Sequence, residues 1–483
     1  MEKRMVKKRI LFIAHHNNDF DHFLPLIVNY KKDRDISTKI LAFYTKDGIL
    51  KNKLHKYICT SNSIELDSMM DICHFGKINN LLNKIHLFVL THLKEGEKTD
   101  SRSKRIKQMT AGFIKSPLNT VLRFLHYSFL RYHVISSIFL LTQKNINKYI
   151  DSNNIDLVII DQRTADESLI DSKPINRFID AYTGKIDPMN LVLLRFAKTA
   201  RERKIPIVMM PHGPQPISKP NIDPKNKLRI EKLKDPFRPD FLFLGSEKEL
   251  SSLHHMEGIR STFYLGDPRF DIEWINYLES CALDVYGPTV TKPADKKVLL
   301  YLMDIFTYDL TNNFEYKKRM HQDILSLVNY FPDLEVWVKH HPRDVFDIPL
   351  DDFIVNDKRR SIKQFGNDTD TNILLAKADI CLAASSTVLI SPILQRKPVI
   401  FYDKWKEVLQ NATSIYDGVS FKASSRKELI TQCEKILKGE YFIDDAYLEK
   451  LYRDVFSGNY LYENMLLKYN TQIDKILETY KIN

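Results

Sequence analysis

The sequence predicts an α/β protein with two successive, doubly wound parallel sheets. Short, continuous apolar runs recur along the chain, as expected for parallel strands that are buried on both faces. Amphipathic segments with helical spacing, such as residues 190–204, separate these runs, and alternation of strand and helix is typical of a doubly wound sheet. The 483 residues are also too many for one hydrophobic core, so more than one domain is expected.

A first series of apolar runs predicts the strands of an N-terminal domain, residues 1–275. The runs are RILFIAHH from Arg9, IDLVIIDQR at 155–163, IPIVMMPHG at 205–213, DFLFLGSEKEL at 240–250 and STFYLGDPRFD at 261–271. Residues from about 78 to 150 carry no strand pattern, so we expect a helical insertion there. Basic residues alternate with Phe, Leu and Tyr in it, which fits a solvated helical insertion or contact with an anionic membrane surface.

A second series follows after a pause in the pattern. Residues 276–296 lack strand character and contain prolines and a glycine, so we expect them to link two domains. The runs KVLLYLMD (297–304), LEVWVKHHP (334–342), DFIVND (352–357), ADICLAAS (378–385) and KPVIFYD (397–403) predict the strands of a C-terminal domain, residues 297–455. Residues 456–483 are predicted to be helical and to pack back on the first domain. Two Rossmann-like domains that face each other across a cleft form the arrangement called GT-B.

Charge and composition restrict the partners. The formal net charge is +11, from 72 basic and 61 acidic residues, which favours nucleotides, phosphorylated lipids, acidic glycans or an anionic membrane surface as partners. The sequence contains no helix-turn-helix, zinc-finger or RNP-like signature, so nucleic acid is not an expected partner.

Cysteine usage and apolar length indicate a cytoplasmic protein. The five cysteines form no CxxC pair, which argues against a disulfide framework or a zinc site and favours a reducing compartment. The apolar run near the N-terminus is shorter than the roughly 7–15 residues of a secretory signal, and residues 133–142 are shorter than the about 20 needed to span a bilayer. Peripheral attachment to the inner face of the cytoplasmic membrane is compatible with this prediction.

Ligands of open parallel sheets bind beyond the carboxyl ends of the strands, so the residues after each run are the candidates for a site. His212 follows one run and precedes Gly213, which allows a sharp turn. A neutral histidine there is suited to take a proton from an acceptor hydroxyl, with Gly213 at the ligand, although a strand-capping histidine is the alternative. His16 and Asp19 follow the first run and are weaker candidates, Asp19 for catalysis and His16 for contact with the acceptor.

Two further loops of this kind carry cations. Arg269 lies in the segment GDPRFD, where it is suited to contact a phosphate or an acidic acceptor, or else to form an ion pair with Asp267 or Asp271. The segment KHHPR at 339–343 follows a strand, and its lysine, histidine and arginine are suited to hold phosphate oxygens. Because adjacent strand residues point to opposite faces, one histidine is expected to be structural. The predicted donor-binding residues of this loop are Lys339, His341 and Arg343.

A fourth loop contains Ser385, Ser386 and Thr387, between a buried strand and an apolar helix. Small hydroxyl residues at a helix N-terminus leave backbone N–H groups available for an anion, so we expect donor phosphate here, with an ordinary helix cap as the alternative. The nearby triplet Asp368-Thr369-Asp370 is similar to a metal-binding DxD motif, but its position before an apolar helix favours capping. We therefore expect no metal and no other cofactor.

Taken in order, these loops resemble those of the CDP-glycerol glycerophosphotransferase family and related GT-B enzymes of bacterial surface polymers. The matching segments are His212-Gly213-Pro214, Gly266 to Asp271, Lys339 to Pro342, and Ser385-Ser386 within 378–403. Two segments depart from the family pattern: MDIFTYD stands where the family has PT-x-R, and Ala383-Ala384 where it has Asp-Tyr. Transferases of CMP-linked sialic acid and Kdo carry a similar HP segment and serine pair.

The resemblance implies a transferase that moves a sugar or polyol phosphate from a nucleotide-activated donor, CMP- or CDP-linked, to a glycan or lipid-linked acceptor. In that case His212 is the general base, and His341 and the serine pair bind the donor's phosphates. A non-hydrolysing UDP-sugar 2-epimerase is the first alternative, although a histidine–arginine pair expected after the strand at 297–304 is missing. A non-catalytic module that binds membrane or glycan is the second alternative.

Overall fold

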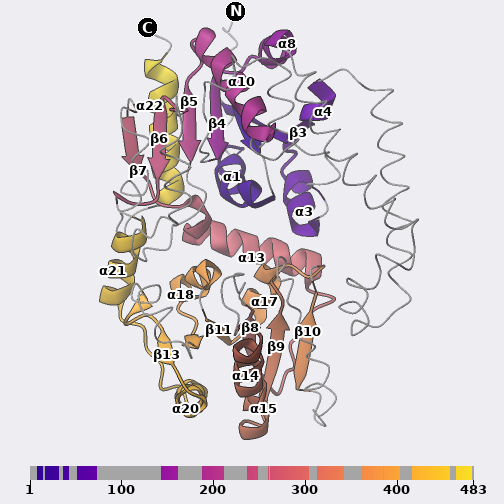
Figure 1. Ribbon diagram of the computed structural model, residues 1–483, viewed down its shortest axis with the longest axis vertical. Coiled ribbons are helices and arrows are strands. Elements are labelled where there is room, and N and C mark those ends of the chain that lie inside the picture. The colour runs from indigo at the N-terminus through magenta and orange to yellow at the C-terminus, as the bar shows by residue number, and fades with distance from the viewer. Residues whose placement is uncertain are drawn as a thin grey trace, which may run out of the picture.

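The computed structural model describes two parallel sheets arranged end to end along the long axis of the molecule, with helix α13 crossing between them (Figure 1). The described residues are 8–14, 17–31, 36–42, 50, 52–72, 143–161, 188–210, 237–247, 259, 261–303, 313–341, 361–366, 368–384, 386–402, 416–456 and 464–480. Most of the predicted insertion at 78–150 therefore lies outside the described residues.

The first sheet has seven parallel strands in the order β3-β2-β1-β4-β5-β6-β7. They are β1 Lys8–Ala14, β2 Ile36–Ala42, β3 Glu65–Ser68, β4 Leu157–Asp161, β5 Ile207–Met210, β6 Phe241–Leu244 and β7 Ser261–Tyr264. Five of these strands, β1, β4, β5, β6 and β7, lie in the apolar runs that were predicted to form strands, and so confirm that prediction. Strands β2 and β3 were not predicted, because polar residues interrupt the sequence ISTKILA and the edge strand ELDS has only one apolar residue.

Helices cover both faces of this sheet. They are α1 Asn17–Tyr30, α3 Lys53–Ser61, α4 Met69–Ile72, α8 Gln143–Asn153 and α10 Pro188–Glu202. Apolar residues of α1 and α3 pack with one set of strand side chains, and those of α8 and α10 pack with the alternate set. The alternation follows from the strand period of two, which points successive side chains to opposite faces.

The second sheet has six parallel strands in the order β10-β9-β8-β11-β12-β13. They are β8 Lys297–Leu302, β9 Leu334–Lys339, β10 Ile362–Phe365, β11 Ile380–Ala383, β12 Val399–Tyr402 and β13 Phe421–Ala423. The associated helices are α14 Asn313–Leu325, α15 Leu327–Tyr330, α17 Thr371–Lys377, α18 Ile390–Leu394 and α20 Arg426–Leu437, with a 3-10 turn, η4, at Thr387–Leu389. The predicted strand at 352–357 lies outside the described residues.

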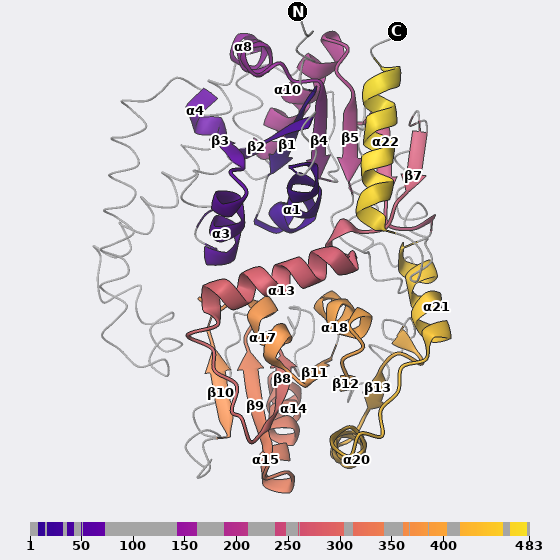
Figure 2. The ribbon, with the colours of Figure 1, turned by 180° about the vertical axis from the view of Figure 1, so that it is seen from behind.

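The segment between the two sheets begins as a helix. A 3-10 turn, η3 (Pro268–Phe270), leads into α13 (Ile272–Tyr286), which Asp271 caps by accepting hydrogen bonds from Glu273 N and Trp274 N. After β8 to β13 the chain forms α21 (Asp445–Phe456) and α22 (Met465–Thr479). Figure 2 shows α22 beside the first sheet, and its Tyr469 hydroxyl donates to Gly266 O at 2.8 Å.

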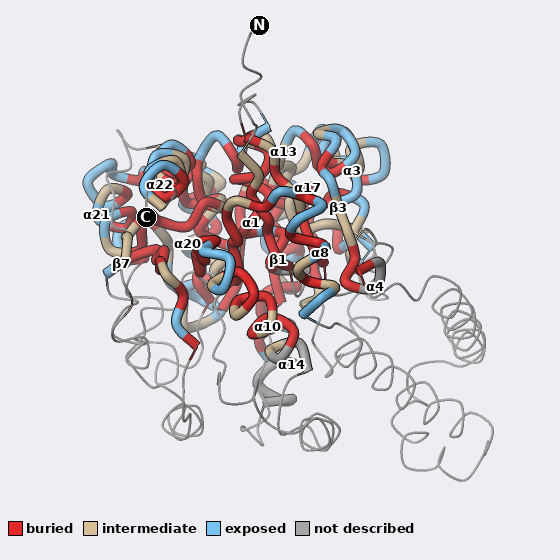
Figure 3. The backbone as a smooth tube through the Cα atoms, turned by 90° about the horizontal axis from the view of Figure 1, so that it is seen from above, coloured by how far each residue is buried: buried red, intermediate tan, exposed pale blue. Residues whose placement is uncertain are grey.

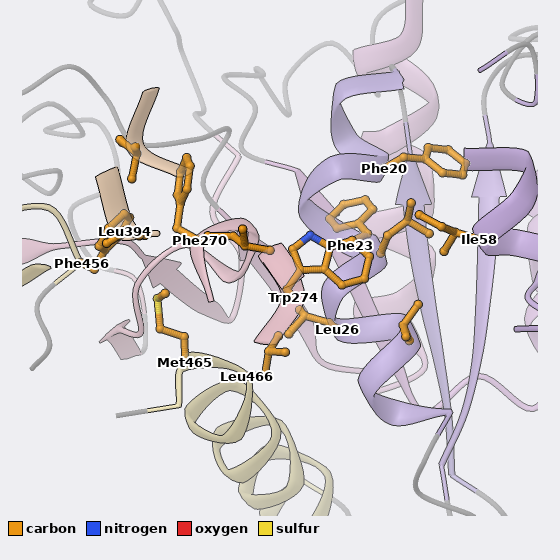
Figure 4. Close-up of a cluster of buried hydrophobic side chains, with 14 of the residues drawn as sticks. Phe20, Phe23, Leu26, Ile58, Phe270, Trp274, Leu394, Phe456, Met465 and Leu466 are labelled. Atoms are coloured by element: carbon orange, nitrogen blue, oxygen red, sulfur yellow. The ribbon is translucent and has the colours of Figure 1, made fainter. Parts of the chain in front are cut away.

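One continuous apolar core joins both sheets through α13. It contains Phe12 and Leu157 from the first sheet and Val298 and Val399 from the second. In Figure 4, Trp274 of α13 lies beside side chains of α1, while Phe270, Leu394 and Phe456 gather further along. Figure 3 shows how burial is distributed along the chain, with buried segments in the middle and exposed turns on α3 and α21 at the rim. The described part of the chain contains no helix that is long and apolar enough to cross a membrane.

The two sheets are oriented with their carboxyl ends toward each other. In Figure 1 the arrowheads of β4, β5, β6 and β7 point toward α13 from one side, and those of β9 and β10 point toward it from the other. Because ligands of open α/β sheets bind beyond the carboxyl ends of the strands, the functional residues are expected on these two facing edges.

Candidate functional site

Each sheet has a point where the strand order reverses. In the first sheet this switch point lies between β1 and β4, which are adjacent parallel strands, and in the second sheet between β8 and β11. The connections from these strands leave in opposite directions, which opens space for a ligand at the carboxyl edge. Helix α1 follows β1 and Asp161 ends β4, so both contribute to the edge of the first sheet.

The first group at this edge is a pair formed by Asp21 of α1 and His55 of α3. The Nε2 atom of His55 lies 2.8 Å from Oδ1 of Asp21. His55 is buried and stacks on Phe20 with ring centroids 5.7 Å apart. Asn52 fixes the start of α3, because its Oδ1 accepts hydrogen bonds from Leu54 N at 2.8 Å and His55 N at 3.2 Å. The imidazole is thus held in place by stacking on Phe20, by the hydrogen bond from the His55 backbone to Asn52, and by its own hydrogen bond with Asp21.

The second group is an ion pair between Asp267 and Arg269, on the segment that follows β7. Arg269 Nη2 lies 2.8 Å from Asp267 Oδ2, and the backbone N–H of Arg269 donates to Asp267 Oδ1 at 3.0 Å. The ion pair with Asp267 that the sequence offered for Arg269 is therefore present. Asp267 is buried, whereas the Arg269 side chain keeps part of its surface exposed.

Burial and charge shift the pKa values of these groups in different directions. Burial raises the pKa of Asp267, but Arg269, His22 and the hydrogen bonds from Arg269 hold it below the ordinary value. The pKa of His22 is lowered to about 4, mainly by burial. The positive charge of Arg269 contributes to this lowering, whereas the nearby carboxylates act to raise the pKa. His22 is therefore neutral at physiological pH, in the interior beneath the ion pair.

The Asp21–His55 pair is shifted toward its charged form. Burial lowers the pKa of His55, but its hydrogen bond to Asp21 and the charges of Asp21 and Asp370 raise it above the ordinary value. Desolvation raises the pKa of Asp21. The hydrogen bond with His55 and the positive charges of His55, Arg269 and His22 outweigh this effect and bring the pKa below its ordinary value. The pair favours a carboxylate and an imidazolium.

The facing edge of the second sheet carries Lys339 at the end of β9 and hydroxyl residues after β11. Lys339 is buried, and its Nζ donates to Gly366 O at 2.6 Å. Burial lowers the pKa of Lys339, and Asp370 and Asp368 oppose this shift. Ser386 precedes η4 without making a side-chain cap, and Thr387 begins this turn. The Ser386 hydroxyl is therefore not used to cap the turn.

The two edges are joined directly by Asn52 and Asp370. The Nδ2 atom of Asn52 donates to Oδ2 of Asp370 at 3.2 Å, while Oδ1 of Asp370 accepts from Asn372 N at 2.9 Å and caps α17. The triplet Asp368-Thr369-Asp370 therefore acts as a helix cap, as its sequence context predicted. Among the described residues, no three His, Cys, Asp or Glu side chains are grouped as metal ligands would be.

The structure describes six of the eleven predicted site residues. Asp19 and Arg269 lie on the adjoining elements α1 and η3 at the first edge, and Asp19 is fully buried. At the second edge, Lys339 ends β9 and His341 follows that strand, while Ser386 and Thr387 follow β11. The other five, His16, His212, Gly213, Arg343 and Ser385, lie outside the described residues. Their assigned roles stay predictions.

Asp21, His55, Asp161 and Asp267 lie at the first edge but are not among the site residues predicted from the sequence. Asp161 ends the apolar run LVIID, so attention to carboxylates as well as histidines after each strand would have found it. Asp21 lies only two residues after the predicted Asp19, on the exposed side of the same helix. His55 had no signal of its own, because its partner is 34 residues away and the pairing depends on how α1 and α3 pack.

No protein-family model matches the chain, and no curated protein matches its sequence. Its structure is similar to three solved UDP-GlcNAc 2-epimerases. These are the enzyme from Methanocaldococcus jannaschii (13% identity, TM-score 0.53, 97% of this chain and 99% of that chain covered), a UDP-N-acetylglucosamine 2-epimerase (11%, 0.52, 99% and 98%), and the enzyme from Neisseria meningitidis bound to UDP-GlcNAc (12%, 0.51, 98% and 100%).

At such low identity these similarities establish the fold alone. The chain has two parallel α/β domains of the GT-B type, as its sequence predicted, and the similarity extends over nearly its whole length. The resemblance to CDP-glycerol glycerophosphotransferases is carried by the sequence motifs, since no family match supports that particular family.

Proposed function

We propose that this protein is a transferase that uses a nucleotide-activated donor. The donor is a CMP- or CDP-linked sugar or polyol phosphate, and the acceptor is a glycan or lipid-linked precursor of a bacterial surface polymer. The observation that carries the proposal is the pair of facing sheet edges, of which one bears carboxylates and histidines and the other bears a lysine and hydroxyl groups. We place the reaction in the cytoplasm, at the inner face of the membrane.

The chemistry of the two edges suits the two substrates. Cations, hydroxyls and free backbone N–H groups stabilise phosphate oxygens, so the edge of the second sheet is assigned to the donor. Its proposed residues are Lys339, His341, Arg343, Ser385, Ser386 and Thr387. Carboxylates and neutral histidine accept protons from hydroxyl groups, so the edge of the first sheet is assigned to the acceptor. Its proposed contacts are His16, Gly213 and Arg269.

The reaction is a direct displacement at the activated carbon or phosphorus. His212 or a carboxylate of the first edge takes the acceptor proton, while the donor edge stabilises the leaving nucleotide by electrostatic interaction. The proposal includes no metal or other cofactor, because the leaving phosphate is neutralised by the lysine and histidine of the donor edge.

A non-hydrolysing sugar-nucleotide 2-epimerase is the second candidate function. It is favoured by the three structures reported above, which are all UDP-GlcNAc 2-epimerases and cover nearly the whole chain. Such an enzyme would use the same two edges, with a base and an acid acting on the sugar of a bound UDP-sugar. The two functions differ in the nucleotide and in the need for an acceptor.

A nucleotide panel followed by a turnover assay tests the proposal. Purified full-length protein is heated with CMP, CDP, UDP, GDP or ADP, and the shift in melting temperature is measured. Stabilisation by CMP or CDP, followed by acceptor-dependent release of that nucleotide from its activated donor, is the expected result. Stabilisation by UDP and conversion of UDP-GlcNAc to an epimer without acceptor would establish the second function. Glycan binding without turnover of any nucleotide-activated substrate would indicate a non-catalytic module.

A further inference from the structure

At the edge of the first sheet, Asp21 differs from its neighbouring carboxylates in exposure. The side chains of Asp19, Asp161 and Asp267 are at most 2% exposed. The Asp21 side chain, in contrast, is 51% exposed, although one of its oxygens contacts the buried His55 ring. A group that takes a proton from a bound substrate has to be reached by that substrate, and among the described aspartates of α1, β4 and η3 only Asp21 meets this condition.

We infer that Asp21 accepts the proton of the acceptor hydroxyl and that His55 is the positioning residue that holds it. The inference rests on the proposed transferase function and names which carboxylate of the first edge performs the proton transfer. Asp21 is thereby assigned as a catalytic residue. His55, whose side chain is 6% exposed, acts through Asp21 and does not contact the substrate.

The hydrogen bond between the two residues leaves one carboxylate oxygen available. His55 Nε2 engages Oδ1 of Asp21 at 2.8 Å. No described residue forms a hydrogen bond with Oδ2, so that oxygen is the one that can reach a substrate hydroxyl. A carboxylate anchored through one oxygen keeps a fixed direction for the other, which reduces the entropy lost when the reacting groups align.

His55 is itself unable to change position easily. Its backbone N–H is bound to the Asn52 cap, its ring stacks on Phe20, and α3 packs against α13. The Nδ1 atom of His55 is buried and has no hydrogen-bond partner among the described residues. Among the described residues, packing and Asp21 set the orientation of the imidazole, as expected for a residue whose function is to hold a carboxylate.

The charged groups around the pair keep Asp21 ionised. His55 faces it from α3, Arg269 from η3 and His22 from its own helix, and Asp370 faces His55 from the second domain. A carboxylate is a weak base, but the acceptor oxygen becomes strongly acidic once its new bond has begun to form. An ionised carboxylate in contact with that oxygen is therefore sufficient, provided that it stays deprotonated at the working pH.

The step balances as follows. The acceptor O–H bond breaks, its proton moves to Oδ2 of Asp21, and the electron pair of the oxygen forms the bond to the activated carbon or phosphorus of the donor. The bond from that atom to the leaving phosphate oxygen breaks, and its electron pair goes to the departing nucleotide. The Asp21 proton is afterwards lost to solvent, which reaches the half-exposed side chain.

The test compares Asp21→Asn and His55→Gln with the wild-type chain. Asp151→Asn is the matched control, because Asp151 is also an exposed aspartate with an ion-pair partner, Arg203, and lies on α8 away from the facing edges. Initial rates with the donor and acceptor found in the turnover assay are measured from pH 4 to 9, together with the melting temperature and its shift by the product nucleotide.

We expect Asp21→Asn to lower kcat by about 10²- to 10⁴-fold, the usual range for loss of a general base, with an unchanged shift by the nucleotide. His55→Gln is expected to lower kcat by about tenfold or more and to move the acidic limb of the kcat profile to higher pH, because Asp21 loses the partner that favours its ionised form. The control Asp151→Asn is expected to retain the wild-type rate and profile.

Three outcomes would overturn the assignment. An Asp21→Asn variant within about threefold of the wild-type rate would exclude Asp21 as the base, since removal of a general base costs at least about 10²-fold. A slow His55→Gln variant whose acidic limb does not move would exclude the positioning role. A wild-type chain without transferase activity toward any activated donor would overturn the proposed function and this assignment with it. The first two outcomes, which concern variants of an active wild-type enzyme, would overturn only the roles of Asp21 and His55.

Discussion

Asn52 of the first domain donates a hydrogen bond to Asp370 of the second, with Nδ2 and Oδ2 3.2 Å apart. Both residues also cap a helix, Asn52 through its amide oxygen at the start of α3 and Asp370 through its second carboxylate oxygen at the start of α17. One pair of side chains thus fixes two helix ends and the approach of the two sheet edges. Any change in this pair acts on helix stability and on the domain contact together.

Exchanging the two residues separates these effects. Asn52→Asp keeps an oxygen for the α3 cap but places two carboxylates against each other, so we expect a lower melting temperature. Asp370→Asn retains Oδ1 for the α17 cap, and the double variant restores the hydrogen bond with donor and acceptor exchanged. Thermal unfolding of all four chains is expected to give a coupling free energy of about 0.5–1 kcal/mol in favour of the double variant. Simple additivity would mean that the contact does not form.

Gly266 is expected to be intolerant of a side chain for two reasons. Its φ is +83°, and a Cβ atom there would lie 2.3 Å from Sδ of Met465, while its carbonyl accepts the Tyr469 hydroxyl. Gly439 has a similar φ of +78° but open space around it, so it reports the backbone cost alone. Gly439→Ala is expected to cost about 1 kcal/mol and Gly266→Ala about 2–4 kcal/mol in free energy of unfolding by denaturant. Equal losses would show that Met465 moves aside freely.

Much of the fold could be predicted because buried parallel strands leave a local signal. Runs such as LVIID, IVMM and LEVWVK are rich in apolar residues and buried along their whole length, and the sheet places each of them where the alternation of strands and helices requires. Edge strands lack this signal, since ELDS and FKA are covered on fewer sides and can be polar. The absence of a strand pattern at 276–296 predicts a linker, but the residues up to Tyr286 are helical and belong to α13.

The candidate site was less predictable, because it depends on contacts between distant segments. Arg269 could be found next to Asp267, two residues away, and Lys339 at the end of its strand. In contrast, the pairing of Asp21 with His55 requires α1 and α3 to be packed together, and the contact of Asn52 with Asp370 spans 318 positions. No local spacing encodes such pairs.

Lys339 is expected to stabilise the second domain whether or not it binds donor phosphate. Its Nζ donates to Gly366 O at 2.6 Å from a buried position, and Thr369 N donates to the same oxygen at 3.3 Å. Lys339→Met removes the shorter, charge-assisted bond and should cost about 1–3 kcal/mol. If the same ammonium group contacts the donor, the variant also loses at least about tenfold in nucleotide affinity, or about 1.4 kcal/mol. Titration by calorimetry measures this affinity.

The matched control for this variant is Lys422→Met. Lys422 also lies in a strand of the second sheet, β13, but its side chain is exposed and forms an ion pair with Asp417. We expect it to change stability by less than about 1 kcal/mol and nucleotide affinity not at all. An Lys339→Met chain that is destabilised yet binds nucleotide as the wild type does would assign Lys339 a structural role only.

The buried His22 predicts how stability depends on pH. Its pKa is lowered from 6.5 to about 4, so the unfolded chain binds a proton between these values that the folded chain does not. Stability contributed by neutral His22 is therefore complete above pH 6.5 and is lost as the pH falls toward 4, by about 3 kcal/mol in total at about 1.4 kcal/mol per pKa unit.

His22→Gln removes this contribution, and the free energy of unfolding measured by denaturant between pH 7 and 4 should fall less steeply than in the wild type. Two neighbours do not mask the effect. Asp267 has a lowered pKa, so its contribution to stability changes only when the pH falls below the ordinary pKa of 3.8. His55 has a raised pKa, so its contribution is lost only as the pH rises above 6.5. Identical slopes in the two chains over this window would mean that His22 is protonated in the folded protein, and that the Asp267–Arg269 ion pair above it is arranged differently in solution.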